Sequence, residues 1–70
     1  MMTQKQVSRI KEQYPAGTRI RLIHMEDAQA VPDGMTGTVS LVDDAGQIHM
    51  KWDNGRSLAI CPEVDIFEKI

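Results

Sequence analysis

The chain has few aromatic residues and a single cysteine. Tyr14, Trp52 and Phe67 are the only aromatic residues, so Trp52 must supply a large share of any core. Cys61 stands alone, which excludes an internal disulfide and is typical of the reducing cytoplasm. No apolar run approaches the length of a membrane-spanning helix, and the N-terminus lacks the apolar block of a signal peptide. We therefore expect a cytoplasmic protein with no membrane partner.

The length and composition indicate one small domain over residues 1–70. Seventy residues lie near the lower limit at which a core alone can hold a fold, and an apolar fraction of 41% is ordinary for a globular chain. Internal repeats and low-complexity tracts are absent from the sequence. We expect the chain to fold without a metal, a cofactor or a disulfide.

The net charge of −2 conceals an asymmetry between the two parts of the chain. Residues 1–25 carry five cations and one carboxylate, whereas residues 26–70 carry three cations and nine carboxylates. A protein that binds nucleic acid normally has a basic face overall. Here such a face would have to be built from the first third of the chain, and solvated surface charge is the simpler interpretation.

The first residues have the pattern of an amphipathic helix. Thr3 followed by Gln6 matches a capping box, and Pro15 ends the pattern because the residue before a proline avoids helical angles. Apolar residues recur between them at helical spacing, namely Val7, Ile10 and Tyr14. We predict a helix over residues 3–13. Its narrow apolar stripe either covers one opening of the domain or faces a partner.

The rest of the chain alternates between polar and apolar residues, as in β-strands. In residues 18–24, Ile20 and Leu22 fall on one face and Arg19 and Arg21 on the other. Residues 37–42 form the second predicted strand, with Val39 and Leu41 facing inward. The third strand contributes Ile48, Met50 and Trp52 to the core, the fourth contributes Leu58 and Ile60, and the fifth covers residues 66–70.

Two glycine-bearing turns flank the third predicted strand. They are Asp43-Asp44-Ala45-Gly46 and Asp53-Asn54-Gly55-Arg56. Asn-Gly between apolar runs is a strong hairpin signal, because both central residues of that turn need positive φ. We interpret Asp43 and Asp53 as turn residues that cap backbone amides.

Together these segments predict a mainly β fold. A long polar loop spans residues 25–35, and residues 61–65 suit a short helical turn before the last strand. Five short strands with these connections describe a small SH3-like five-stranded barrel over residues 17–70, preceded by one N-terminal amphipathic helix.

Several motifs in these segments also carry a family resemblance. They read Tyr14-Pro-x-Gly17-Thr-Arg, Pro32-x-Gly34-x-x-Gly37-Thr-Val39, Val42-Asp-Asp-x-Gly46-x-Ile-His49-x-Lys-Trp52-Asp-Asn-Gly55-x-Ser-Leu58 and Asp65-x-Phe67. The chain thereby resembles the bacterial domain-of-unknown-function family numbered 4314. The resemblance implies an SH3-like barrel, and it brings no activity and no catalytic residues. It also implies an origin in Gram-positive bacteria, their phages or mobile elements.

The residues give no support for catalysis or metal binding. His24, His49 and Cys61 lack metal-ligand spacing, and strand alternation places the two histidines on opposite faces. Ser40 and Ser57 have no histidine and aspartate partners at suggestive spacing, and no glycine-rich phosphate loop precedes a helix. A barrel this small also has no interior room for a substrate. We expect neither an enzyme nor a small-molecule substrate.

The leading hypothesis is a non-enzymatic module that binds another protein. Glu26, Asp27 and Asp33 make the loop 25–35 acidic, so this loop could hold a segment that bears lysine or arginine. An exposed edge of the barrel could accept an extended segment as an added strand. By analogy with the phage and mobile-element proteins that the chain resembles, the module would be a small regulator or inhibitor.

Two alternatives remain open at this point. The first is a nucleic-acid accessory protein, for which alternation turns several basic residues away from the core: Arg19, Arg21, His49, Lys51 and Arg56. The helix cations would extend that stripe, although no exposed aromatic residue is expected to stack on bases. The second alternative is a homo-oligomer in which the helix docks on a neighbouring copy.

Overall fold

One helix and four strands make up residues 2–70, the part of the chain that the computed structural model describes. They are α1 (Gln4–Gln13), β1 (Arg19–His24), β2 (Thr36–Val42), β3 (Ile48–Trp52) and β4 (Ile66–Lys69). All neighbouring strands are antiparallel, and their order in the sheet is β3-β2-β1-β4. The chain is therefore mainly β, as predicted. Within residues 2–70, no helix has the length and apolar character needed to cross a membrane.

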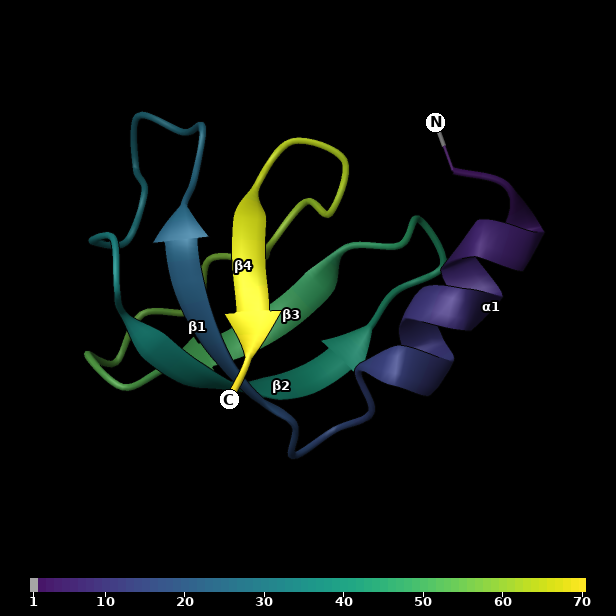
Figure 1. Ribbon diagram of the computed structural model, residues 1–70, viewed down its shortest axis with the longest axis horizontal. Coiled ribbons are helices and arrows are strands. Elements are labelled where there is room, and N and C mark those ends of the chain that lie inside the picture. The colour runs from purple at the N-terminus through teal and green to yellow at the C-terminus, as the bar shows by residue number, and fades with distance from the viewer. Residues whose placement is uncertain (1) are drawn as a thin grey trace.

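The predicted capping box starts α1. Thr3 Oγ1 accepts a hydrogen bond from Gln6 N at 3.1 Å, and Gln6 Oε1 accepts one from Thr3 N at 2.8 Å. Val7 on the apolar stripe is buried, and Ile10 and Tyr14 are partly buried against the core. Figure 1 shows α1 beside the end of the sheet where β2 turns into β3. Of the two positions that the sequence left open, the helix takes the one in which its stripe packs on its own sheet.

Strand alternation places the core as predicted in β1 and β3, but the prediction that Leu41 of β2 faces inward is wrong. Leu41 is 53% exposed, because the register of β2 on β3 shifts between Val39 and Leu41. Ile20 and Leu22 of β1 are fully buried, and Trp52 at the end of β3 is only 3% exposed. The opposite face of β1 carries Arg19 and Arg21, which are exposed. One cluster joins the buried side chains of the sheet and the loops: Ile20, Leu22, Met25, Val31, Val39, Ile48, Met50, Trp52 and Ile60.

The predicted strand around Leu58 and Ile60 does not form, so the prediction of a closed five-stranded barrel is wrong. The segment does lie antiparallel to β3, because Ile60 and Ile48 exchange two backbone hydrogen bonds of 2.8 and 2.9 Å. Closer to the turn, the indole Nε1 of Trp52 donates a hydrogen bond to the carbonyl oxygen of Leu58 at 2.7 Å. The Trp52 side chain thus occupies the carbonyl oxygen that a regular β-ladder between β3 and this segment would use. The segment does not become a fifth strand, and the four-stranded sheet stays unclosed.

The two glycine-bearing turns differ in how far they match the prediction. Asp43 caps its own turn, since Oδ1 accepts from Ala45 N and Gln47 N at 3.0 Å each. In the second turn Gly55 alone has positive φ, at +89°, whereas Asn54 does not. Asn54 instead accepts a hydrogen bond from Arg56 N through its side chain, so the turn is not of the predicted two-residue type.

A buried carboxylate ties the long loop to the start of β4. Asp65 is 9% exposed, and its Oδ1 accepts from Glu26 N at 3.2 Å. Its Oδ2 accepts from Cys61 N at 2.8 Å. The predicted helical turn lies here, because Asp65 N and Val64 N both donate to the carbonyl oxygen of Cys61. One side chain thereby fixes the loop 25–35 beside the turn that leads into β4.

Candidate functional site

Three of the predicted cations share the outer face of the sheet. The register places Lys51 of β3 opposite Thr38 of β2, and Thr38 opposite Arg19 of β1. Arg21 lies two residues further along β1, on the same face. All three cationic residues are exposed, so the predicted direction of their side chains is confirmed.

Arg19 is bound in a two-pronged ion pair with Asp53. Nη1 donates to Oδ1 at 2.9 Å, and Nη2 donates to Oδ2 at 2.8 Å. Thr36 Oγ1 donates to the same carboxylate. These hydrogen bonds, above all those from Arg19, hold the pKa of Asp53 far below its usual range, and the pair raises the pKa of Arg19. Asp53 therefore bonds the side chains of β1 and β2 in place of the turn amides that the sequence predicted.

Two further residues of the predicted basic set face carboxylates. Arg21 Nη1 donates to Glu68 Oε2 of β4 at 3.2 Å. His49 Nε2 lies 2.8 Å from Asp43 Oδ2. The bond with His49, followed by those from the turn amides, lowers the pKa of Asp43. The outer face is thus a surface of mixed charge.

Arg56 is not part of the outer face. Its guanidinium donates to the backbone carbonyl oxygens of Ala30, at 3.0 Å, and of Gln29. It anchors the tip of the loop 25–35 to the turn that follows β3. Lys51 is the one predicted cation with no hydrogen bond or ion pair within residues 2–70. The five predicted residues therefore do not make one continuous stripe.

We expect the free energy of unfolding to decrease as the pH is lowered from about 5 to 2. The pKa values of Asp53 and Asp43 are lowered by folding. Both carboxylates therefore stabilise the fold above their unfolded pKa of about 4, and this contribution is lost as the pH falls toward the folded values. In urea unfolding, Asp53→Asn should make the free energy of unfolding depend less on pH between about 5 and 2. Arg19→Gln should have the same effect, because it removes the hydrogen bonds that lower the pKa of Asp53 most. If the free energy of unfolding fell as steeply with pH in both variants as in the parent, this account would be contradicted.

The acidic loop gathers two of its three predicted residues around His24. Asp33 Oδ1 lies 3.2 Å from His24 Nδ1, and Glu26 Oε1 lies 3.4 Å from His24 Nε2. Both carboxylates remain largely exposed, at 66% and 70% of their side-chain area. Asp27 instead caps a local turn, because its Oδ1 accepts from Gln29 N at 2.7 Å. In the part of the chain that the structure describes, no group of three or more His, Cys, Asp or Glu side chains could hold a metal ion.

The free edge of the sheet lies along β4. β4 comes last in the strand order and pairs with β1 alone, which lies beside it in Figure 1. Ile70 N donates to Arg19 O, so these two residues form a hydrogen-bonded pair. Hydrogen-bonded and non-hydrogen-bonded pairs alternate along an antiparallel ladder, so Lys69 and Ile20 form a non-hydrogen-bonded pair. The backbone amides of Lys69 and Phe67 therefore face away from β1, toward a position that another strand could occupy.

Apolar side chains accompany this open edge. Ile66 and Ile70 are each 55% exposed, and Ile23 at the end of β1 is 44% exposed. The inner side of β4 is different, because Phe67 packs edge-on against Tyr14 with ring centroids 5.4 Å apart. One face of β4 thus contributes to the body of the domain, and the other presents large aliphatic groups to solvent.

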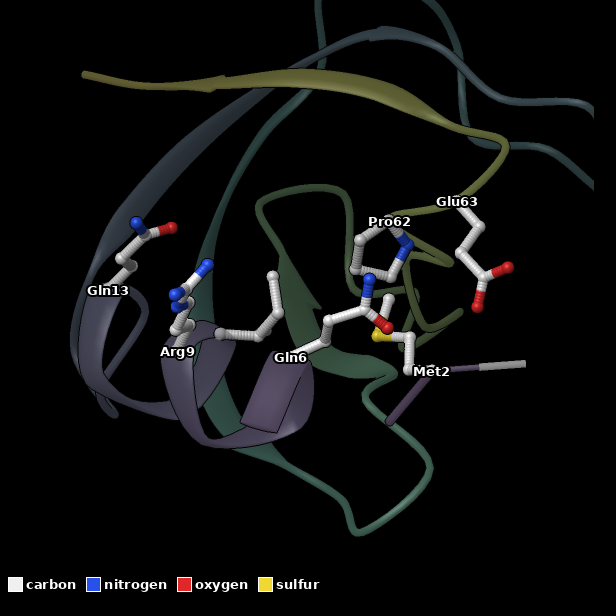
Figure 2. A pocket seen from close by; sticks show the side chains of 7 residues that line it. Met2, Gln6, Arg9, Gln13, Pro62 and Glu63 are labelled. Carbon is white, nitrogen blue, oxygen red and sulfur yellow. The ribbon is translucent and has the colours of Figure 1, made fainter. Parts of the chain in front are cut away.

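A pocket of about 360 Å³ lies between α1 and the turn at residues 61–65. Figure 2 shows Gln6, Arg9 and Gln13 on its helix side, and Pro62 and Glu63 on its turn side. The guanidinium and the two amides supply hydrogen-bond donors, and Ile10 is among the apolar residues of the lining. The pocket has room for one side chain of a bound segment. No sequence motif marks it, because it arises only where the helix packs beside a turn that is distant along the chain.

The structure and its surfaces define a small mainly β protein with one packed helix and an open-edged sheet. The chain belongs to the family described as Domain of unknown function (DUF4314), which it matches over residues 3–70. No curated protein and no solved structure matches the chain.

Proposed function

We propose that the protein is a non-enzymatic, SH3-like module that binds an extended segment of another protein. The SH3-like assignment is supported by the long loop after β1, the helical turn before β4 and the pairing of β4 with β1. The segment around Leu58 and Ile60 would correspond to the missing strand, since it already bridges to Ile48. A role as a small regulator or inhibitor rests on the family resemblance alone.

The open edge of β4 is the observation that carries the proposal. An exposed strand edge is a template for another strand, because its unpaired backbone groups can bond a partner's backbone. The amides of Phe67 and Lys69 supply these groups, and Ile66 and Ile70 supply apolar area next to them. A segment bound here gains backbone hydrogen bonds and aliphatic contacts together.

The acidic loop lies at the N-terminal end of the same edge. Ile66 pairs with His24, and Asp65 bonds Glu26 N, so the carboxylates of Glu26 and Asp33 lie near the start of β4. A segment added to β4 would meet these carboxylates as it leaves the sheet. A lysine or arginine at that end would be favoured, and the rate of association would fall with salt.

A selection of random nine-residue peptides against the protein tests the proposal. We expect peptides that bind the parent and Lys69→Ala but not Lys69→Pro, because proline removes the outward amide and its ring blocks the approach. Lys69→Ala is the matched control for loss of the lysine side chain, which lies over the ring of Tyr14. Selected peptides should shift the amide resonances of β4. Peptides that bind both variants equally, or no selectable peptide at all, would overturn the proposal.

The nucleic-acid alternative is tested with duplex and single-stranded probes at low salt. Arg19 and Arg21 are each paired with a carboxylate, so we expect no shift with any probe. A shift that weakens with salt and is lost in Lys51→Glu would favour nucleic acid over a protein partner.

A further inference from the structure

We propose that the segment bound by β4 has the pattern apolar–x–basic–x–apolar. The three specified residues of the segment lie on the same face as Ile66, Glu68 and Ile70 of β4, the face that is exposed to solvent. This inference rests on the proposed function and names the chemistry of the partner. It follows from the order of the side chains on the exposed face of β4.

The outer face of β4 reads apolar, acidic, apolar. Successive side chains of a strand point to opposite faces, so Ile66, Glu68 and Ile70 share one face and Phe67 and Lys69 share the other. Ile66 and Ile70 are more than half exposed, and the Glu68 side chain is 48% exposed. All three outer side chains are therefore available to a strand laid along this edge.

Residues directly opposite in paired strands interact through their side chains. Their Cβ atoms lie about 4.5–5.5 Å apart, so aliphatic residues are favoured opposite Ile66 and Ile70, and a cation is favoured opposite Glu68. Arg21 donates only to Oε2 of that carboxylate. Within residues 2–70 no donor bonds Oε1, which leaves this oxygen for a lysine or arginine of the partner.

A second copy of β4 fits this edge poorly. An antiparallel pairing that matches the outward amides sets Phe67 of one copy opposite Lys69 of the other. Glu68 then lies opposite Glu68, and like charges in that position are destabilising. Moving the register by two residues sets Glu68 opposite Ile66 or Ile70 instead. The edge therefore favours a partner with a basic central residue over self-association.

Two synthetic peptides test the pattern. One presents Ile-Thr-Arg-Thr-Ile between flanking threonines, and the other has glutamate in place of arginine. In amide chemical-shift titrations at low salt, we expect the arginine peptide to bind the parent about fivefold more tightly than the glutamate peptide. Glu68→Lys should invert this preference, and Glu68→Gln should remove it. Asp44→Lys is the matched charge-reversal control, since Asp44 lies in the turn between β2 and β3 and should leave the preference unchanged.

The outcomes separate this inference from the proposed function. Equal binding of the two peptides, a preference that survives Glu68→Lys, or no binding of either peptide would overturn the pattern. If Glu68→Lys disturbs the fold by releasing Arg21, the loss of preference in Glu68→Gln decides instead. The random-peptide selection still reports on the edge itself: peptides without the pattern that depend on the amide of Lys69 would leave the proposed function standing.

Discussion

Trp52→Ala should lower the free energy of unfolding by about 3–5 kcal/mol, the range for deleting a buried aromatic side chain. The indole is 3% exposed, and it belongs to the cluster that fills the sheet. It also donates from Nε1 to the carbonyl oxygen of Leu58, so truncation leaves that oxygen without its partner. Urea unfolding followed by far-UV circular dichroism would measure the change.

Two controls accompany this substitution. Lys51→Ala changes the preceding residue, which points to the opposite face, and should leave stability within about 0.5 kcal/mol of the parent. Trp52→Phe keeps an aromatic ring but removes the indole donor, so it separates the hydrogen bond from the packing. If Trp52→Ala and Lys51→Ala were tolerated equally, the strand register described for β3 would be wrong.

Gly37→Ala should destabilise the protein by about 3 kcal/mol, because β2 has no space for a side chain at this position. A Cβ there would lie 2.8 Å from Cε3 of Trp52, 2.9 Å from the carbonyl oxygen of Lys51 and 3.0 Å from Cα of Trp52. Two of these atoms belong to the backbone of β3, so a change of side-chain rotamer cannot relieve the contact. We expect a lower midpoint in urea and shifted resonances along β2 and β3.

Gly17→Ala provides the comparison for Gly37→Ala. No atom lies within 4 Å of a Cβ built on Gly17, but its φ is +93°. That substitution therefore costs only the strain of a left-handed backbone, about 1–2 kcal/mol. A larger loss for Gly17→Ala than for Gly37→Ala would show that the close packing of β2 on Trp52 contributes little.

Local patterns in the sequence predicted the elements that depend on local physics. The capping box of Thr3 and Gln6 fixed the start of α1, and alternation identified the buried face of β1 and the inward direction of Trp52. The turn cap at Asp43 also followed from residue type. In each case the deciding contacts lie within a few residues or follow from the two-residue period of a strand.

Apart from the turn type at residues 53–56, the direction of Leu41 and the strand at Leu58, the errors concern contacts between segments that are distant along the chain. The pairs of Arg19 with Asp53 and of Arg21 with Glu68 depend on which strands become neighbours, and composition does not contain that information. The sequence did contain one signal for these ion pairs: arginines on one predicted strand, and acidic residues elsewhere that could lie next to them in the sheet. This signal becomes useful only once the strand order is known. The missing strand at Leu58 has a different origin. The indole of Trp52, six residues earlier, takes the carbonyl oxygen of Leu58, and strand alternation does not reveal such a side-chain contact.

The clamp at Asp65 has a consequence for how binding events combine. Its two oxygens hold Glu26 N and Cys61 N at once, so a ligand that pulls the acidic loop away from the carboxylate also loosens the chain just before β4. Binding to the loop that breaks these hydrogen bonds would therefore change the affinity of the β4 edge for an added strand. By reciprocity, strand addition would change the affinity of the loop by the same factor.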